Sequence, residues 1–572
     1  MPSINRMLQI MKKTLFALLG ILLPTLPPAA TAADFTYLSD GEAITITRYI
    51  GSNSVVTIPD TITGRPVTGI GDWAFYNCSN LASVTIGTNV TGIGNQAFYN
   101  CTSLTNATIG TNVTNMGEWA FASCSNLASI TIPNRVTSIG ANTFDSCVRL
   151  TSATLGTNIA SIGDWAFYGC AKLTRITIPD SVTTIGINTF TYCTSLTNAT
   201  IGNHVTHIGE WAFYSCSKLT SITIPDSVIN IGSNALMSCA SLTNATIGNG
   251  VTNIGEWAFY GCPKLTSATL GTNLASIGEH AFYSCTNLAG ITIPGSLTRI
   301  GDDAFFGCSK LASLTFPDSV TYIGEECFTS CTGLTNVTFG AGVTHIGRVA
   351  FYGCSKLTSL TIPDSVTQIG DEAFAYCSGL TNVVFGAGIT RIDANVFYGC
   401  SKLARLTIPD SITHIGTNAF TACSTLASVT IGTNVVSIED NVFYNCVRLR
   451  GTYFLGNAPP DIGLNVFYNA SNMIVYYMPG TTGWGATFGG RPAVLWNPQI
   501  EPRDPLFGMG TNHFGFNISG TTNIPIVVQA CTNLENAAWA PLLTTNLTGG
   551  SFHFDDTGWT NHPARFYNVC WP

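Results

Sequence analysis

The sequence contains few charged side chains. Asp, Glu, Lys and Arg together make up 9% of its 572 residues, and the net charge is −8. Proteins that bind nucleic acid or an anionic membrane usually carry a basic patch on their surface. The acidic balance of this chain therefore gives no reason to expect either partner.

Motifs of common catalytic sites are also missing from the sequence. The chain has no glycine-rich phosphate loop, no Gly-x-Ser-x-Gly elbow and no His-Glu-x-x-His motif. His204 and His207 lie close together, but Glu210 is the only further ligand type nearby. Carboxylates are spread over whole repeats, so they form no unique acid–base pair. We therefore expect no catalytic residue, no metal site and no cofactor, and we predict that the protein is not an enzyme.

Long apolar runs are absent except near the N-terminus. Lys12 and Lys13 precede an apolar run at 15–23, and the small residues Ala30-Thr31-Ala32 follow it. A basic flank, a short apolar core and a small-x-small site are typical of a secretory signal, and the run is too short to span a bilayer. We expect residues 1–33 to be removed near Ala32 or Ala33. The mature chain would then be secreted or exposed at the cell surface, with no transmembrane segment.

The dominant feature of the sequence is a period of 23 residues. Cysteine recurs at this spacing from Cys78 to Cys446, seventeen times without a slip. A fixed period in this range is typical of a solenoid, a stack of similar coils. Within each repeat, alternating apolar residues indicate a strand that a Pro or Gly ends. We predict a repeat solenoid with a parallel β-sheet on one face and short turns or helical turns, such as 164–170, on the other.

The period also sets the expected domain organisation. Short alternating runs before the first repeat indicate a cap, and short strands between turn-rich segments follow the last repeat. After the signal peptide we expect an N-terminal cap at 34–60, repeats at 61–473, a C-terminal cap at 474–497 and a small β-sandwich-like module at 498–572.

The repeat resembles a known family. Its pattern Val-Thr-x-Ile-Gly-x-x-Ala-Phe-x-x-Cys-x-x-Leu-x-x-Ile-x-Ile-Pro is similar to the leucine-rich repeat of the BspA type, also called the Treponema pallidum type, over about residues 35–496. The resemblance implies a right-handed solenoid and a role in surface adhesion. The C-terminal module resembles, more loosely, accessory modules of secreted proteins from Verrucomicrobia-like bacteria, and this resemblance supplies no catalytic residues.

We interpret the repeated cysteines as buried thiols, because free cysteine is a small and readily buried side chain. Neighbouring coils would lie about 5 Å apart, so bridges between them are geometrically feasible, but a regular stack with an odd number of cysteines favours no pairing. Cys531 and Cys570 lie outside the array and are better candidates for a disulfide. The predicted structural ladder includes Cys78, Cys101, Cys124, Cys147, Cys170, Phe167 and Phe213.

A stripe of aromatic residues is the candidate binding surface. Tryptophan recurs every 46 residues, and tyrosine often follows the repeated phenylalanine; the members of the stripe are Trp73, Trp119, Trp165, Trp211, Trp257, Tyr168, Tyr214 and Tyr260. Exposed rings at such a spacing would bind sugars or a protein. The alternative is that the rings lean on neighbouring coils and shield phenylalanine, since aromatic side chains are buried on average.

These patterns favour a binding protein. We predict adhesion or protein–protein interaction through the solenoid, with an extracellular protein or a glycan as ligand and no nucleic acid partner. One alternative is a structural envelope or matrix protein whose repeats associate with one another. Another is a polysaccharide-binding protein that uses the Trp and Tyr stripe. The threonines that recur at the outward strand position are explained by strand propensity, because threonine suits a half-exposed strand. An ice-binding array of hydroxyl groups is the less favoured explanation.

Overall fold

The computed structural model describes residues 31–510, 513–562 and 564–571. Of the predicted signal peptide, residues 1–30 lie outside this described part. The chain forms two compact units, 1–262 and 263–572. Among the described residues, no helix combines the length and the apolar character needed to cross a membrane.

The first unit begins with a β-cap. A short 3₁₀ helix, η1 (Ala32–Asp34), leads into the antiparallel pair β1 (Phe35–Ser39) and β2 (Ile44–Tyr49). The ring of Tyr49 stacks on that of Phe75 with 5.2 Å between centroids. The cap therefore covers the apolar end of the first coil, which would otherwise face water.

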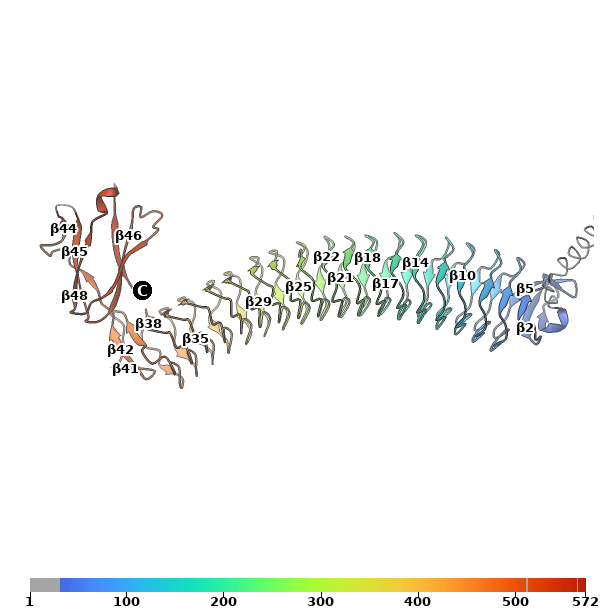
Figure 1. The fold of residues 1–572 in the computed structure, drawn as a ribbon, viewed down its shortest axis with the longest axis horizontal. Helices are drawn as coiled ribbons and strands as arrows, with labels where there is room; N and C mark the ends of the chain where they lie inside the picture. Colours follow the sequence, from blue (N-terminus) through green and yellow to red (C-terminus); the bar gives the residue numbers. More distant parts are fainter. Residues whose placement is uncertain (1–30, 511–512, 563, 572) are drawn as a thin grey trace, which may run out of the picture. The chain divides into compact units, whose positions relative to one another are not determined.

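Behind the cap, each coil of the first unit contributes one strand to each of two parallel rows (Figure 1). The first row contains β3 (Val55–Thr57), β6 (Ser83–Thr85), β8 (Asn106–Thr108), β10 (Ser129–Thr131), β12 (Ser152–Thr154), β14 (Arg175–Thr177), β16 (Asn198–Thr200), β18 (Ser221–Ile224) and β20 (Asn244–Ile247). The second row contains β5 (Arg65–Ile70), which forms a hairpin with β4 (Thr61–Ile62), and then β7 (Gly92–Ile93), β9 (Asn115–Met116), β11 (Ser138–Ile139), β13 (Ser161–Ile162), β15 (Thr184–Ile185), β17 (His207–Ile208), β19 (Asn230–Ile231) and β21 (Asn253–Ile254).

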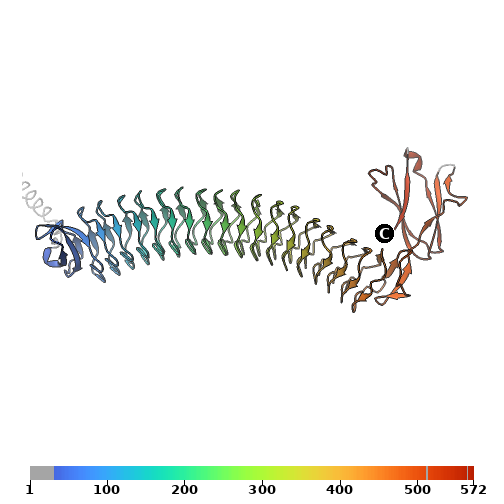
Figure 2. The ribbon, with the colours of Figure 1, turned by 180° about the vertical axis from the view of Figure 1, so that it is seen from behind.

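The second unit, described by itself, has the same two-row pattern (Figure 2). Its first row contains β22 (Ser267–Thr269), β24 (Gly290–Ile291), β26 (Ser313–Thr315), β28 (Asn336–Thr338), β30 (Ser359–Thr361), β32 (Asn382–Val384), β34 (Arg405–Ile408), β36 (Ser428–Ile431), β38 (Gly451–Phe454), β40 (Ile474–Tyr477) and β42 (Arg491–Leu495), the last forming a hairpin with β41 (Thr487–Phe488). Its second row contains β23 (Ser276–Ile277), β25 (Arg299–Ile300), β27 (Tyr322–Ile323), β29 (His345–Ile346), β31 (Gln368–Ile369), β33 (Arg391–Ile392), β35 (His414–Ile415), β37 (Ser437–Ile438) and β39 (Asp461–Ile462).

The solenoid and the parallel strands confirm the predicted fold class, but the turn side differs from the expectation in two ways. A second row of short strands is present, and the segment 164–170 is a series of turns instead of a helical turn. Trp165 has φ +60° and Gly169 has φ +66°, and such left-handed residues interrupt a right-handed helix. The backbone of these turns is held by hydrogen bonds to the next coil, such as Phe167 N–H to Thr189 O at 2.9 Å.

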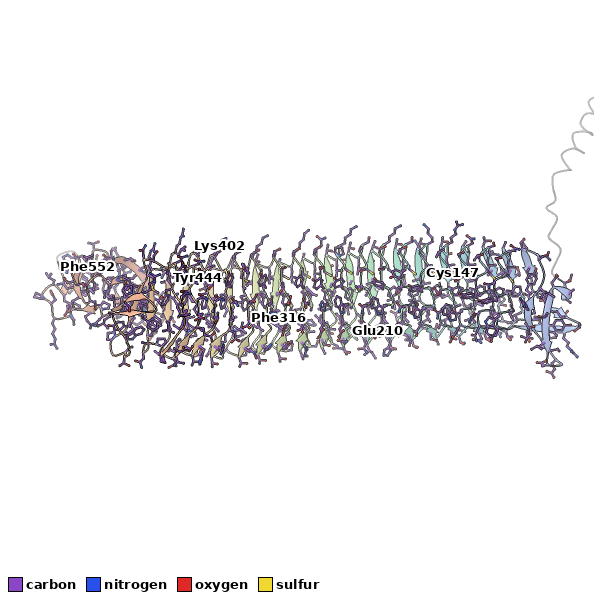
Figure 3. All side chains as sticks on the ribbon, turned by 90° about the horizontal axis from the view of Figure 1, so that it is seen from below. Cys147, Glu210, Phe316, Lys402, Tyr444 and Phe552 are labelled. Atoms are coloured by element: carbon purple, nitrogen blue, oxygen red, sulfur yellow. The ribbon has the colours of Figure 1, made fainter. Side chains whose placement is uncertain are left out.

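Between the rows lies a core to which nearly every coil contributes one phenylalanine and one cysteine. Phe98 and Phe121 stack with 4.9 Å between centroids and 7° between planes, and both are fully buried. The thiol of Cys147, also fully buried (Figure 3), donates a hydrogen bond to the carbonyl of Phe121 in the preceding coil at 3.2 Å. Burial raises the pKa of this thiol well above its usual range. The ladder is thus a packing and hydrogen-bonding device.

In most coils a glycine allows the close stacking of the turns. A Cβ on Gly117 would lie 2.6 Å from the backbone nitrogen of Asn95 in the preceding coil. Asp393 and Glu439 replace this glycine in two coils of the second unit. Arg391 joins them, at 2.6 Å from Asp393 and 3.3 Å from Glu439, so these two breaks in the repeat form an ion-pair cluster.

The C-terminal residues of the second unit form two small antiparallel sheets, which confirms the predicted all-β region. One sheet contains β43 (Gln499–Ile500), β44 (Gly508–Met509), β45 (Phe514–Ser519) and β48 (Ser551–Asp556). The other contains β46 (Pro525–Cys531), β47 (Ala540–Asn546) and β49 (Phe566–Cys570), and the 3₁₀ helix η2 (Trp559–Asn561) precedes β49.

These two sheets share their hydrophobic core with the last coils. Tyr453 and Tyr476 replace the outward threonine of the first row, since Thr430 pairs with Tyr453 and Tyr453 with Tyr476. Both tyrosines are buried in one cluster with side chains of β45, β46 and β48. Trp571 stacks on Tyr453 at 5.6 Å and donates its indole N–H to the Thr430 hydroxyl at 3.0 Å. The C-terminal sheets and the final coils therefore stabilise each other.

The disulfide expected between Cys531 and Cys570 is not formed, and both cysteines are free thiols. They lie on neighbouring strands, but Cys531 pairs with Phe566 and Cys570 pairs with Val527. Four residues of offset along a strand correspond to about 13 Å, whereas a disulfide requires Cα atoms within about 7 Å. The strand register thus keeps the two thiols apart.

Candidate aromatic binding surface

In the first unit, five aromatic residues from three successive coils form a continuous surface group. We call Trp165, Tyr168, Tyr192, Trp211 and Tyr214 the Trp–Tyr ridge. The ring centroids of Trp165 and Tyr168 are 4.7 Å apart, those of Tyr168 and Tyr192 5.5 Å, those of Tyr192 and Tyr214 5.3 Å, and those of Tyr214 and Trp211 4.9 Å. Contacts of this length are typical of favourable aromatic pairs.

The ridge is held at the corner of each coil by unusual backbone geometry. Trp165 and Trp211 have φ of +60° and +59°, and Tyr192 has φ +60°. Their N–H groups donate to the next coil, as from Trp165 to Ile187 O at 2.8 Å. Trp165 is 37% exposed and Tyr192 41% exposed, while the phenylalanines beneath them are fully buried. The rings therefore both lean on neighbouring coils and present apolar area to solvent.

The remaining residues of the predicted stripe are not part of the ridge. Trp257 contacts Tyr260 at 4.9 Å, and Trp119 contacts Tyr99 at 6.3 Å. Trp73 is 56% exposed, near the N-terminal cap. The structure thus brings together four residues of the predicted stripe, Trp165, Tyr168, Trp211 and Tyr214, and adds Tyr192.

The second unit contains a related group that we did not predict as a site. Tyr352, Tyr376 and Tyr398 lie eight repeats of 23 residues after Tyr168, Tyr192 and Tyr214. The ring centroids of Tyr352 and Tyr376 are 5.2 Å apart, as are those of Tyr376 and Tyr398, at interplanar angles of 63° and 56°. With Glu372 they line a hollow of about 180 Å³. We call these four residues the Tyr–Glu site.

The sequence does contain a signal for both aromatic groups, but it is a departure from the 23-residue repeat and is missed by a search for recurring residues. Tyr192 and Tyr376 occupy the position just before the repeated cysteine, where the other repeats of the array have Gly, Ser, Asn or Ala. At Tyr376 the next coil has a glycine in this position, and a Cβ on Gly399 would lie 3.0 Å from the Tyr376 ring. An aromatic residue at a position otherwise reserved for small residues therefore marks each group.

The outward face of the first row carries a second kind of surface feature. Open hollows lie over this face at the ends of some of the strands. One such hollow, of about 520 Å³, is lined by Thr177, Thr200 and Thr223 beside Pro179, Gly202 and Pro225. A similar hollow of about 280 Å³ lies over Thr108 and Thr131. These hollows are open and recur with the repeat, so they offer repeated contacts in place of one enclosed site.

The histidines take structural roles in the coils. His204 Nδ1 lies 2.9 Å from Asp180 O, and His207 Nδ1 lies 2.9 Å from the Thr206 hydroxyl. Across the residues that the structure describes, no group of three or more His, Cys, Asp or Glu side chains is arranged to hold a metal ion.

Comparison with known families identifies the repeat. The model of the BspA type leucine-rich repeat region (6 copies) matches residues 49–174, 160–286, 253–360 and 344–474. The chain belongs to the BspA-type leucine-rich repeat family. The matches span well over half of the sequence and end before the C-terminal sheets. The looser resemblance of the C-terminal module to accessory modules of secreted proteins therefore remains a prediction.

Several solved bacterial proteins are similar to this BspA-type chain. A leucine-rich repeat protein from Bacteroides ovatus is 26% identical, with 78% of this chain and 94% of that one covered and a TM-score of 0.38. A leucine-rich cell surface protein from Faecalibacterium prausnitzii is 29% identical, with 75% and 96% covered and a TM-score of 0.33. The leucine-rich repeat protein of T. pallidum is 26% identical, with 46% and 90% covered and a TM-score of 0.22. No curated protein gives a significant match.

Proposed function

We propose that this protein is exported and acts at the cell surface as an adhesion or protein-interaction solenoid, with the Trp–Tyr ridge as a principal contact surface. The observation that carries the proposal is the ridge itself: five contiguous rings, three coils wide, partly exposed on a backbone that is hydrogen-bonded to the next coil. Exposed Trp and Tyr dominate the binding energy of protein interfaces, and pre-positioned rings lose little entropy on binding. The weakly charged, repeated surface supports multivalent contact.

Polysaccharide binding is the second candidate, because the same exposed rings present flat apolar faces of the kind that stack on sugars. Self-association is the third, since similar open hollows lie over the first row in the first unit and one of about 230 Å³ lies over that row in the second. Each candidate predicts a different ligand for the same protein, so one experiment separates them.

The test uses the full mature chain on arrays of extracellular proteins and glycans, followed by ultracentrifugation. A ridge variant carries Trp165→Asn, Tyr192→Ser and Trp211→Asn. These replacements suit the left-handed backbone, because Asn142 and Ser238 occupy the same repeat positions with φ of +56° and +61°. Trp73→Asn is the control, being an exposed Trp at the same repeat position outside the ridge.

We expect saturable binding to a protein that the ridge variant weakens about tenfold or more and the control leaves unchanged, as for loss of interface hot spots. Saturable binding to a glycan alone would favour the polysaccharide candidate. Concentration-dependent self-association without any ligand would replace the proposal with a structural role.

A further inference from the structure

The Tyr–Glu site differs chemically from the Trp–Tyr ridge. Its three tyrosine rings are mutually inclined beside a hollow of about 180 Å³, and Glu372, Ala375 and Asn395 also line that hollow. The hollow is smaller than the roughly 300–1,000 Å³ typical of pockets for drug-sized ligands. Its volume suits a single headgroup or side chain.

We propose that the Tyr–Glu site binds an alkylammonium group, such as a lysine side chain or a quaternary amine presented by a ligand. The negative face of an aromatic ring attracts a cation, and several rings around one hollow are the arrangement that recognises alkylated ammonium groups. A carboxylate at the wall supplies a complementary charge. The proposal concerns the second unit and does not depend on the ridge.

Electrostatic details of the site agree with this chemistry. Glu372 forms no ion pair with another side chain in the described part of the chain, so its charge is available to a ligand. The pKa of Tyr376 is raised by its burial and by the neighbouring Tyr398, Tyr352 and Glu372. Tyr376 therefore stays neutral at physiological pH.

The ridge provides the natural contrast. Asn188 stands in the first unit where Glu372 stands in the second, and Trp165 and Trp211 stand where the second unit has Val349 and Asn395. The pKa of Tyr192 is raised by Tyr214, by burial and by Tyr168, with no carboxylate among its causes. Three similar tyrosines thus lie beside a carboxylate in one unit and beside an amide in the other.

The test is a ligand-observed NMR titration of the full mature chain with choline, n-butylammonium and 3,3-dimethylbutan-1-ol, the neutral isostere of choline. We expect both cations to bind and the isostere to bind at least about fivefold more weakly, which is the size of a partly exposed cation–π contact. Stronger binding of butylammonium would identify lysine as the source of the group, and stronger binding of choline a quaternary amine.

Variants assign the binding to the site. Tyr376→Ser and Glu372→Asn should each weaken cation binding by about fivefold, and Tyr376→Phe should preserve it because the ring remains. Tyr192→Ser, the equivalent change in the ridge, should have no effect. Circular dichroism verifies that each variant is folded. Equal binding of choline and its isostere, or cation binding that survives Tyr376→Ser in the folded protein, would overturn the proposal.

Discussion

The Trp–Tyr ridge and the Tyr–Glu site are two outcomes of one repeat design. Both rest on identical layers: a buried phenylalanine stack, a cysteine that donates to a phenylalanine carbonyl, and three tyrosines at matching positions. They differ at the left-handed corner of the coil, where the first unit has Trp165, Asn188 and Trp211 and the second has Val349, Glu372 and Asn395. The corner side chain does not enter the core. Chemistry at this position can therefore vary without altering the stack.

The largest expected effect comes from removing the support that the two groups share. Phe190 and Phe374 are fully buried below the middle tyrosine of each group and stack on neighbours at 5.2–5.4 Å and 5.3–5.7 Å respectively. Phe190→Ala and Phe374→Ala should each lower the free energy of unfolding of their own unit by about 3–5 kcal/mol, through lost burial and the cavity left behind. Urea unfolding with hydrogen-exchange mapping measures both effects.

A conservative variant sharpens this result. Leu236 replaces the phenylalanine in one natural coil of the first unit and is fully buried, so Phe190→Leu and Phe374→Leu should cost less than about 1.5 kcal/mol. Unequal losses for the two alanine variants would show that the groups do not share equivalent supports.

The core layers could be predicted from the sequence because they repeat. The period placed Cys147, Phe167 and their equivalents inside, and the alternation in segments such as 221–224 identified the first row of strands. The second row was missed because all of its strands after β5 have only two residues, too few to show an alternation. The prediction of a helical turn at 164–170 was wrong because Trp165 has a left-handed backbone. Tryptophan rarely adopts this conformation, so the residue type gave no sign of it.

The two surface groups were only partly predictable for a related reason. A stripe argument finds residues that recur, so it found Trp165 and Trp211. Tyr192 departs from the repeat and Glu372 stands at a variable position of it, and the neighbours of both come from other coils. The core that Tyr453 and Tyr476 share with the C-terminal sheets could not be predicted either. These tyrosines replace the outward threonine of the first row, but that replacement does not show which residues cover them.

A smaller effect is expected at the corner of the second unit. Val349 has φ +59°, a conformation that costs a β-branched residue about 1–2 kcal/mol. Val349→Asn should therefore raise the free energy of unfolding of the second unit by about 1 kcal/mol, since asparagine tolerates this backbone. Denaturant unfolding measures the change. Asn395→Val, two coils further along the chain, is the reciprocal control and should be destabilising by a similar amount. If neither variant changed the stability, the backbone at this corner would have to relax around the side chain.

The smallest expected effect is also the most direct test of the comparison. Asn188→Glu places in the first unit the carboxylate that Glu372 provides in the second, beside tyrosines whose spacing is nearly the same, 5.5 and 5.3 Å against 5.2 and 5.2 Å. Because the site is exposed and screened by solvent, the added attraction for choline should be about 0.5–1 kcal/mol, or roughly two- to fivefold. The titration is made in a Glu372→Asn background, so that gained binding belongs to the first unit.

Asn188→Gln in the same background is the matched control, since it lengthens the side chain without adding charge. Added salt should reduce the gain, because an exposed ion pair is screened. If Asn188→Glu gained nothing in the folded protein, the carboxylate would not be what separates the two groups, and the difference would lie in the flanking residues, Trp165 and Trp211 in one unit and Val349 and Asn395 in the other.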